Sequence, residues 1–471
     1  MKKYILLIFP VLFFACTNTS TPDSLIEKQA VIFPDYNGVT FPYNIAPPNF
    51  AIEEEGDGFM VEIGQKDNES VIKYKSSKPE IYIPQSAWKK LLTQAKGNDI
   101  YFRIYVHNNN KWAQYADISN TISEEPIDEY LVYRLLYPGY ELWNQMGIYQ
   151  RNLTSYKQEA VVENKSLETG CVNCHTFSKN SPETMLLHIR GAVGGTVIVR
   201  NGKTIKTDMK VKDMNSRGTY PSWHPSGNFI AFSMNDIRQY FHITGDKPIE
   251  VSDLESDLAF YDCETDEIFT DDRISGKEYM ETYPAWAPDG KTLYFCRANA
   301  TTDSTPLDEI RYDLYKLTFD AEKKQITDPV CVYNASDSLK SVSFPRVSPD
   351  GKHLMFTLSD YGNFSIWHPE SELYVWDINN DKIRCLDEVN SNHVDSYHNW
   401  SSTGKWFVFS SKRIDGLWAR PHFASFDPNT GKASKAFVMP QKDPYFYNKF
   451  TKTYNLPELI TAPIKNKRDF K

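Results

Sequence analysis

"TYPSWHPSGNFIAFS", residues 219–233, decides the fold, because three later stretches repeat its pattern. They are "TYPAWAPDGKTLYFC" (282–296), "SFPRVSPDGKHLMFT" (343–357) and "SYHNWSSTGKWFVFS" (396–410), and all four align without gaps. In each, a short apolar strand leads into a Pro-Asp-Gly or similar turn, in which glycine supplies the positive φ, and a second strand follows. Such units, repeating every ~50 to 65 residues and unable to bury their faces alone, predict the blades of a β-propeller.

The propeller is expected to occupy residues 201–471. At ~45 to 50 residues per blade this length predicts about six blades. Trp223, Trp286 and Trp400 stand at one equivalent position of the repeat and are predicted to be core residues.

The N-terminal stretch "MKKYILLIFPVLFFAC" predicts export. Two lysines precede an apolar run that is too short to span a bilayer, which is the layout of a secretory signal peptide. A small residue before Cys16 matches a bacterial lipobox, so residues 1–16 are interpreted as a lipoprotein signal, with Cys16 as the lipidated residue. Residues 17–34 are predicted to form a polar tether. The expected location is the cell envelope, periplasmic or at the outer membrane, with membrane contact only through the lipid.

Residues 35–125 contain short β-rich runs such as "GFMVEIGQ" and "DIYFRIYVHNNNKW", separated by Gly, Asn, Asp and Pro. This spacing predicts an immunoglobulin-like or fibronectin type III-like β-sandwich, with one amphipathic helix over "SAWKKLLTQAK" (86–96). The chain is therefore expected to be all-β, with residues 126–200 as a connecting segment between the sandwich and the propeller.

The connecting segment holds Cys171, Cys174 and His175 in "ETGCVNCHTF" (168–177). A chance Cys-x-x-Cys-His is expected only about 0.002 times in a chain of this composition, and the motif is that of covalent c-type haem attachment. Two thiols would bind the porphyrin, and His175 would be the proximal iron ligand. A thioredoxin-like pair lacks its βαβ context here, and a zinc site lacks a second Cys/His pair. The sequence thus predicts one covalent haem c.

His188 is the candidate for the sixth iron ligand. Ser181, Pro182 and Glu183 resemble the start of a short helix that would carry Met185 and His188 on one face. Met185, His393 and His398 are the alternatives, and an open coordination site is another. His398 is notable because the other three repeats have proline at its position.

The chain as a whole resembles a group of exported bacterial TolB-like propeller proteins that bear one c-type haem motif. The lipobox, "YRLLYPGYELW" (133–143), "CVNCHTF" (171–177), "HIRGAVGGT" (188–196) and the blade repeats carry the resemblance. It implies a propeller and a haem site but no substrate.

Composition limits the remaining possibilities. The formal net charge of -9 argues against nucleic-acid binding, which requires a basic surface. Neither a G-x-S-x-G elbow nor an H-E-x-x-H pair is present, so an enzyme is the less favoured interpretation. Cys263, Cys296, Cys331 and Cys385 could be buried thiols or disulfides.

Two functions remain open from the sequence. The first is electron transfer through the haem, with a redox protein as partner. The second is a propeller scaffold that binds an envelope protein or glycan, with a structural or sensory haem. The sequence does not determine the oligomeric state.

Overall fold

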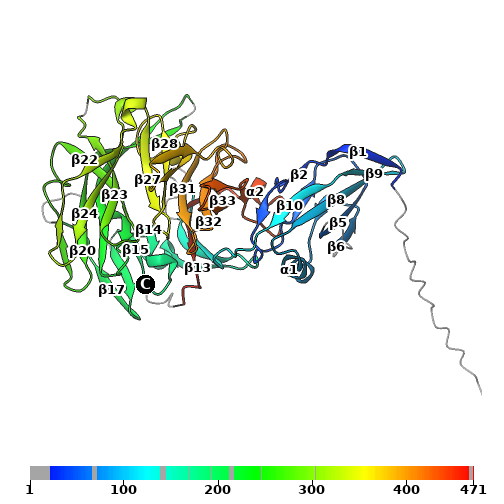
Figure 1. Ribbon diagram of the computed structural model, residues 1–471, viewed down its shortest axis with the longest axis horizontal. Coiled ribbons are helices and arrows are strands. Elements are labelled where there is room, and N and C mark those ends of the chain that lie inside the picture. The colour runs from blue at the N-terminus through cyan, green and yellow to red at the C-terminus, as the bar shows by residue number, and fades with distance from the viewer. Residues whose placement is uncertain are drawn as a thin grey trace, which may run out of the picture.

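The computed structural model describes residues 22–65, 72–137, 145–168, 170–191, 194–211, 217–245, 247–302, 304–465 and 470. It comprises a small N-terminal β-domain and a larger propeller, which lie end to end (Figure 1). The predicted signal peptide and Cys16 lie outside the described residues, so lipidation remains a prediction. None of the described helices is long and apolar enough to cross a membrane.

Two sheets and one helix form the N-terminal domain, in agreement with the predicted sandwich. The larger sheet contains β1 (Ser24–Gln29), β3 (Thr40–Phe41), β5 (Gly58–Gln65), β6 (Ile72–Ser76), β8 (Asp99–Asn108), β9 (Lys111–Ala116) and β10 (Ile118–Ile122). The smaller sheet contains β2 (Ile32–Phe33), β4 (Phe50–Ile52) and β7 (Glu80–Ile81). Helix α1 (Gln85–Gln94) buries Trp88, Leu91 and Leu92, as its amphipathic pattern predicts.

The N-terminal domain begins earlier than the sequence suggested. β1 pairs in parallel with β9, from Ser24 opposite Ala113, although its side chains are mostly exposed. Backbone hydrogen bonds at the sheet edge hold this strand. Because such bonds leave no hydrophobic pattern in the sequence, the mostly polar side chains of β1 do not predict it. The predicted tether over residues 17–34 therefore contains two strands of the domain.

Six sheets of four or five strands, counted over the described residues, form the propeller. The first blade contains β36 (Thr453–Ile460), β11 (Tyr130–Leu136), β12 (Gly147–Asn152) and β13 (Gln158–Glu163). The second contains β14 (Cys171–Phe177), β15 (Met185–Arg190), β16 (Gly195–Arg200) and β17 (Lys203–Thr207). The third contains β18 (Gly218–Trp223), β19 (Phe229–Phe241), β20 (Ile249–Asp262) and β21 (Glu267–Phe269).

The last three blades follow the same plan. The fourth contains β22 (Tyr279–Trp286), β23 (Thr292–Asn299), β24 (Asp313–Asp320), β25 (Gln325–Ile326) and β26 (Val330–Tyr333). The fifth contains β27 (Ser341–Val347), β28 (His353–Ser359), β29 (Glu372–Asp377) and β30 (Lys382–Cys385). The sixth contains β31 (Asp395–Trp400), β32 (Trp406–Ser411), β33 (Arg420–Asp427), β34 (Lys432–Ala433) and β35 (Phe437–Val438). Short helical turns are α2 (Phe446–Lys449), η1 (Asn164–Ser166), η2 (Ser178–Asn180), η3 (Leu307–Glu309), η4 (Ser336–Ser338) and η5 (Ser365–Trp367).

One strand of each blade borders the central channel. These channel strands are β14, β18, β22, β27, β31 and β36, and they contact one another in a closed cycle. Residues 126–200 thus supply two blades, and the connecting segment expected from the sequence does not exist as a separate unit. The sequence concealed this because the first two blades lack the Pro-Asp-Gly turn.

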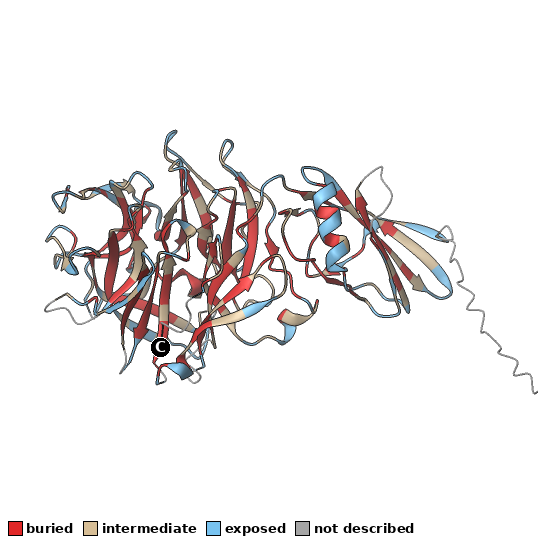
Figure 2. Cartoon of the chain, turned by 90° about the horizontal axis from the view of Figure 1, so that it is seen from below, coloured by how far each residue is buried: buried red, intermediate tan, exposed pale blue. Residues whose placement is uncertain are grey.

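The blades bury their interiors, and the core continues into the N-terminal domain (Figure 2). Trp223, Trp286 and Trp400 are core residues, as predicted. Phe41 of the N-terminal domain packs against Phe437 of the sixth blade with ring centroids 5.1 Å apart, inside one hydrophobic cluster that spans both parts. All six described cysteines are free thiols, so Cys263, Cys296, Cys331 and Cys385 form no disulfide.

Candidate functional site

The Cys-x-x-Cys-His motif lies on β14, the channel strand of the second blade. β14 pairs antiparallel with β15, and the register of this pairing shifts between Asn173 and His175. Cys174 sits at the shift with a φ of 28°. Such a β-bulge bends the strand and redirects its side chains, so it determines where the thiols and the imidazole point.

The same bulge recurs in all six channel strands. Register shifts interrupt the pairing of each strand at the equivalent point. The residues with positive φ there are Cys174, Tyr220, Tyr283, Phe344, Tyr397 and Leu456. The residues that follow them are His175, Pro221, Pro284, Pro345, His398 and Pro457. The Cys-His pair therefore occupies the Tyr-Pro position of the propeller repeat.

The side chains of the motif face different neighbours. The Cys171 thiol lies 3.4 Å from Met146 Sδ, at the start of β12 in the first blade. Cys174 faces the backbone of Tyr220 in the third blade, and burial raises the pKa of its thiol. The His175 imidazole lies beside the backbone of the first blade, and burial lowers its pKa to about 3.

This arrangement does not fit a haem. Both thiols must reach the same porphyrin edge while the histidine reaches the iron, so all three side chains must face one side of the chain. Cys171 and Cys174 instead face opposite blades, and His175 turns away from Cys174. Within the described ranges, no group of three His, Cys, Asp or Glu residues is placed to hold a metal ion.

His188 lies on strand β15, and the helix expected from Ser181 is wrong. Met185 and His188 occupy opposite faces of the strand: Met185 packs in the core shared with the first blade, and His188 faces the third blade. His188 Nδ1 is 3.0 Å from Thr196 Oγ1, and burial lowers its pKa to about 4. Both faces of β15 are buried, so its sequence is a continuous apolar run that resembles a buried helix.

His393 and His398, two of the alternative ligands, lie outside the second blade. His393 is exposed in the turn before β31. His398 occupies the same repeat position as His175 but four blades further along the ring, and its Nε2 is 2.9 Å from the Met355 carbonyl oxygen. The register of β14 and β15 places His188 opposite Asn173 and Met185 opposite Phe177, so these two candidates lie on the strand beside the motif, whereas His393 and His398 belong to the sixth blade.

Aromatic side chains at the bulges close the channel. Tyr220 and Tyr283 have ring centroids 4.5 Å apart, Tyr283 and Phe344 4.1 Å, and Phe344 and Tyr397 4.5 Å. We call these four residues the channel plug. The channel plug forms the inner end of a cavity that opens at one mouth of the channel.

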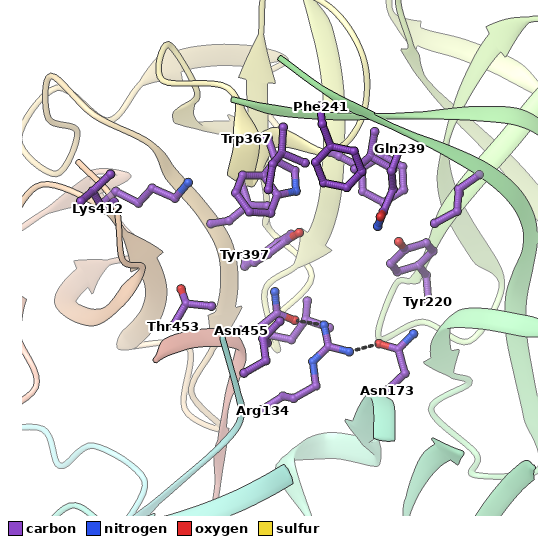
Figure 3. A pocket seen from close by; sticks show the side chains of 18 of the residues that line it. Arg134, Asn173, Tyr220, Gln239, Phe241, Trp367, Tyr397, Lys412, Thr453 and Asn455 are labelled. Atoms are coloured by element: carbon purple, nitrogen blue, oxygen red, sulfur yellow. Dashed lines mark hydrogen bonds between the residues drawn. The ribbon is translucent and has the colours of Figure 1, made fainter. Parts of the chain in front are cut away.

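That cavity has a volume of about 250 Å³. Its polar lining consists of Arg134, Asn173, Arg190, Tyr220, Gln239, Tyr397, Lys412, Thr453 and Asn455 (Figure 3). Its apolar lining consists of Leu136, Ile237, Phe241, Ile249, Val251, Phe364, Ile366, Trp367, Leu417 and Leu456. Among the described residues, the lining thus contains three cationic side chains and no carboxylate, in a molecule with a net charge of -9. We call it the channel-mouth cavity.

Arg134 is positioned by two amides. Its Nη1 donates to Asn173 Oδ1, and its Nη2 donates to Asn455 Oδ1 at 2.9 Å (Figure 3). Neither amide carries charge, and no described carboxylate forms an ion pair with Arg134. The positive charge of the guanidinium is therefore uncompensated at the inner end of the cavity.

Lys412 contributes a second uncompensated charge. It is 8% exposed, and its Nζ lies 4.5 Å from the centroid of the Trp367 ring. Burial lowers its pKa to about 8, while Asp415 acts in the opposite direction. No ion pair of Lys412 exists among the described residues, so its ammonium is desolvated and directed at the cavity.

The long third-blade hairpin covers one side of the cavity. β19 and β20 extend beyond the other strands, so that Ile237, Gln239 and Phe241 reach the lining. Near its tip, Lys247 Nζ is 2.8 Å from Glu370 Oε1 of the fifth blade. The hairpin is thus fastened across the mouth.

Sequence reasoning missed this cavity entirely. Its cations come from three blades, and none stands in a motif. The alternating run over residues 229–241, longer than a usual blade strand, was the available signal.

Comparisons with known proteins identify no family. No protein-family model and no curated protein matches the chain. Among solved structures, the chain is similar to a protein assigned as TolB from Agrobacterium tumefaciens, with 15% identity, a TM-score of 0.39, and coverage of 67% of this chain and 89% of that one. It is also similar to an oligogalacturonate lyase from Vibrio parahaemolyticus, with 11% identity, a TM-score of 0.35, and coverage of 62% and 71%. A DUF4784 family protein from Bacteroides caccae gives 9% identity, a TM-score of 0.35, and coverage of 78% and 97%. These values are low, and the propeller is established by the sheet topology.

Proposed function

We propose that this protein is an exported, non-catalytic β-propeller that binds an anionic ligand in the channel-mouth cavity. The observation that carries the proposal is the set of three cations, with no carboxylate among the described lining residues, around a cavity whose other side chains are uncharged. Buried charges are normally paired, because desolvation of an unpaired charge is costly. A bound anion would supply the missing partner.

The expected contribution of these charges is substantial. A hydrogen bond to a charged group contributes ~1.5 to 3 kcal/mol, more than a neutral one. Lys412 is nearly buried, so water and salt screen its interaction weakly. Anion binding is therefore expected to depend more on Lys412 than on exposed Arg190.

Calorimetric titration tests the charge requirement directly. Phenylacetate and phenylacetamide have the same shape but differ in charge, and only the carboxylate is expected to bind. Lys412→Met should weaken phenylacetate binding at least tenfold, while Lys352→Met, on an exposed turn, serves as the matched control. Equal binding of acid and amide would contradict the proposal.

The cellular location rests on the N-terminal sequence. Lipidation of Cys16 would hold the propeller at the cell envelope, since paired acyl chains supply stable membrane affinity. Cys16→Ser is expected to move the protein from the detergent fraction to the soluble periplasmic fraction. An unchanged distribution would exclude lipid anchoring.

Electron transfer through a covalent haem is the second candidate function. The observation that favours it is His175, which is 3% exposed and whose ring nitrogens have no hydrogen-bond partner among the described residues, with Glu458 Oε1 3.9 Å from Nε2. The orientation of the two thiols opposes it. A pyridine haemochrome spectrum and a haem-stained denaturing gel decide the question: a haem signal that is lost in Cys171→Ala/Cys174→Ala supports attachment, and no signal in the wild-type protein excludes it.

A further inference from the structure

We infer that the ligand of the channel-mouth cavity is the free C-terminus of a polypeptide whose last residues are apolar. This inference rests on the proposed binding function and adds the class of ligand. A polypeptide C-terminus combines one carboxylate, peptide groups and apolar side chains, and the cavity provides a region for each.

Polarity changes along the depth of the cavity. Arg134 and Asn173 lie at one end, and Trp367 and Phe241 lie at the other, where the Lys412 ammonium is 4.5 Å from the centroid of the Trp367 ring (Figure 3). An anionic head is therefore favoured beside Arg134, with an apolar body toward Phe241. A uniformly polar ligand such as a sugar would leave the apolar wall facing hydroxyl groups, which has an unfavourable desolvation cost.

The carboxylate fits the inner end. Arg134 is fixed by its bonds to Asn173 and Asn455, so little side-chain entropy is lost when an anion arrives. Nη1 donates to Asn173 and to the Val172 carbonyl oxygen, and Nη2 uses one hydrogen for Asn455, so its second hydrogen is left to donate to one carboxylate oxygen. Lys412 provides a second positive charge on the far wall.

The peptide groups fit the middle of the cavity. The Gln239 side chain extends from the hairpin into the cavity, opposite the Tyr220 hydroxyl (Figure 3). A side-chain amide both donates and accepts hydrogen bonds, as a peptide group requires. A simple fatty acid has no group that would use Gln239.

Size and surroundings indicate that only the end of a longer molecule enters. Ligand cavities that enclose a whole small molecule usually measure ~300 to 1,000 Å³, and this one is smaller. Its rim is apolar: Phe241 is 51% exposed, Leu417 is 64% exposed, and Ile243 beyond them on the hairpin is fully exposed. Exposed apolar side chains around a cavity are typical of a protein-binding surface. The rest of the partner chain would lie over this rim.

A synthetic peptide pool tests the inference. Octapeptides with three randomised C-terminal positions are made as free acids and, separately, as C-terminal amides, and are passed over the immobilised full-length protein. Free acids with apolar final residues should be retained at least tenfold more than the amides. Lys412→Met should reduce this difference several-fold, and Lys352→Met should preserve it.

A second variant separates the peptide contact from the charge. Gln239→Leu keeps the apolar wall and the three cations, so it should weaken the retained peptides several-fold more than it weakens phenylacetate. Equal loss of both ligands would contradict the assigned role of Gln239.

The possible failures are distinguishable. If phenylacetate binds in a Lys412-dependent manner but acid and amide pools are retained equally, the proposed anion site stands and the C-terminus inference is wrong. If neither binds, both are wrong. If a neutral monosaccharide binds as well as phenylacetate, the charge requirement itself fails.

Discussion

Lys412 is the residue whose ionisation most directly controls the proposed binding. Its amine is nearly buried over Trp367, and burial lowers its pKa to about 8. The phenols of Tyr220 and Tyr397 stay protonated, because burial raises their pKa. The charge of the cavity therefore changes in a pH range where its other groups do not titrate.

Anion affinity is expected to fall as the pH rises through 8. Below this pH Lys412 is charged and attracts the anion; above it the amine is neutral and that attraction is lost. Phenylacetate should bind roughly tenfold more weakly at pH 9.5 than at pH 7, which corresponds to ~1.4 kcal/mol. Calorimetry at both pH values measures the change, and Lys412→Met should remove most of it.

The stability of the free protein should change in the opposite direction. The unfolded chain binds a proton at Lys412 up to its ordinary pKa of 10.5, whereas the folded chain releases it near 8. The unfolded state thus binds more protons between these values, and this lysine makes folding more favourable as the pH rises. For the binding prediction above, an affinity for phenylacetate that increased with pH would contradict the assigned role of Lys412.

The cavity could not have been predicted from the residues that form it. Arg134 and its partner Asn455 are separated by 321 residues, and only the closed ring brings them together. Cys174 and His175 show the reverse problem, since their local motif is rare and suggests chemistry that their place in the fold does not support. A five-residue pattern specifies residue types, but it cannot specify which way a bulged strand directs them.

At the scale of the element, the bulged channel strand is the unit that builds this propeller. A positive φ is unfavourable for residues other than glycine and persists only where packing maintains it. At Tyr283 the packing comes from two neighbouring rings of the channel plug and from a hydrogen bond, 3.1 Å long, from its hydroxyl to the Asn363 carbonyl oxygen. The bulges at the four residues of the channel plug thus stabilise one another.

Tyr283→Ala is expected to lower the free energy of unfolding by ~3 to 5 kcal/mol, the range for large buried aromatic side chains. Tyr283 is 1% exposed, whereas Tyr279 on the same strand is 38% exposed. Urea unfolding followed by circular dichroism measures both variants, with Tyr279→Ala as the control. If the two substitutions cost the same, the plug does not stabilise the ring.

The repeat was readable from the sequence only where its side chains are typical. Tyr-Pro-x-Trp marks the third and fourth blades clearly, and these were predicted. In the second blade, Cys-His-Thr-Phe has the same backbone role, but Cys174 replaces the tyrosine and Phe177 the tryptophan. The backbone geometry is the same while the side chains that identify the repeat differ, so the sequence pattern does not indicate this blade.

At the scale of the whole molecule, the N-terminal domain and the propeller share one hydrophobic core. Tyr36 donates from its hydroxyl to the Val438 carbonyl oxygen at 3.4 Å, and Lys435 Nζ is 2.7 Å from Asp35 Oδ2. Apolar packing of Phe41 on Phe437 continues the contact inward. The domain is therefore expected to be a fixed extension of the sixth blade.

Calorimetric unfolding should show a single transition for both parts, because a shared core couples them. Phe437→Ala should lower stability by ~3 to 5 kcal/mol and separate the transition of the N-terminal domain from that of the propeller. Val330→Ala, at a position 54% exposed, is the control. Two separate transitions in the wild-type protein would show that the parts unfold independently.

The pairing of β36 with β11 has a consequence for how the chain is made. β11 is synthesised early, but its partner on the channel side emerges from the ribosome more than three hundred residues later. Until then the first blade has an open edge, and the ring cannot close on a partly made chain. Contacts so distant in sequence also slow closure. A protein that stays incompletely folded until its synthesis is nearly complete can be threaded through a secretion channel, and the same delay exposes a strand edge that chaperones would have to protect from aggregation.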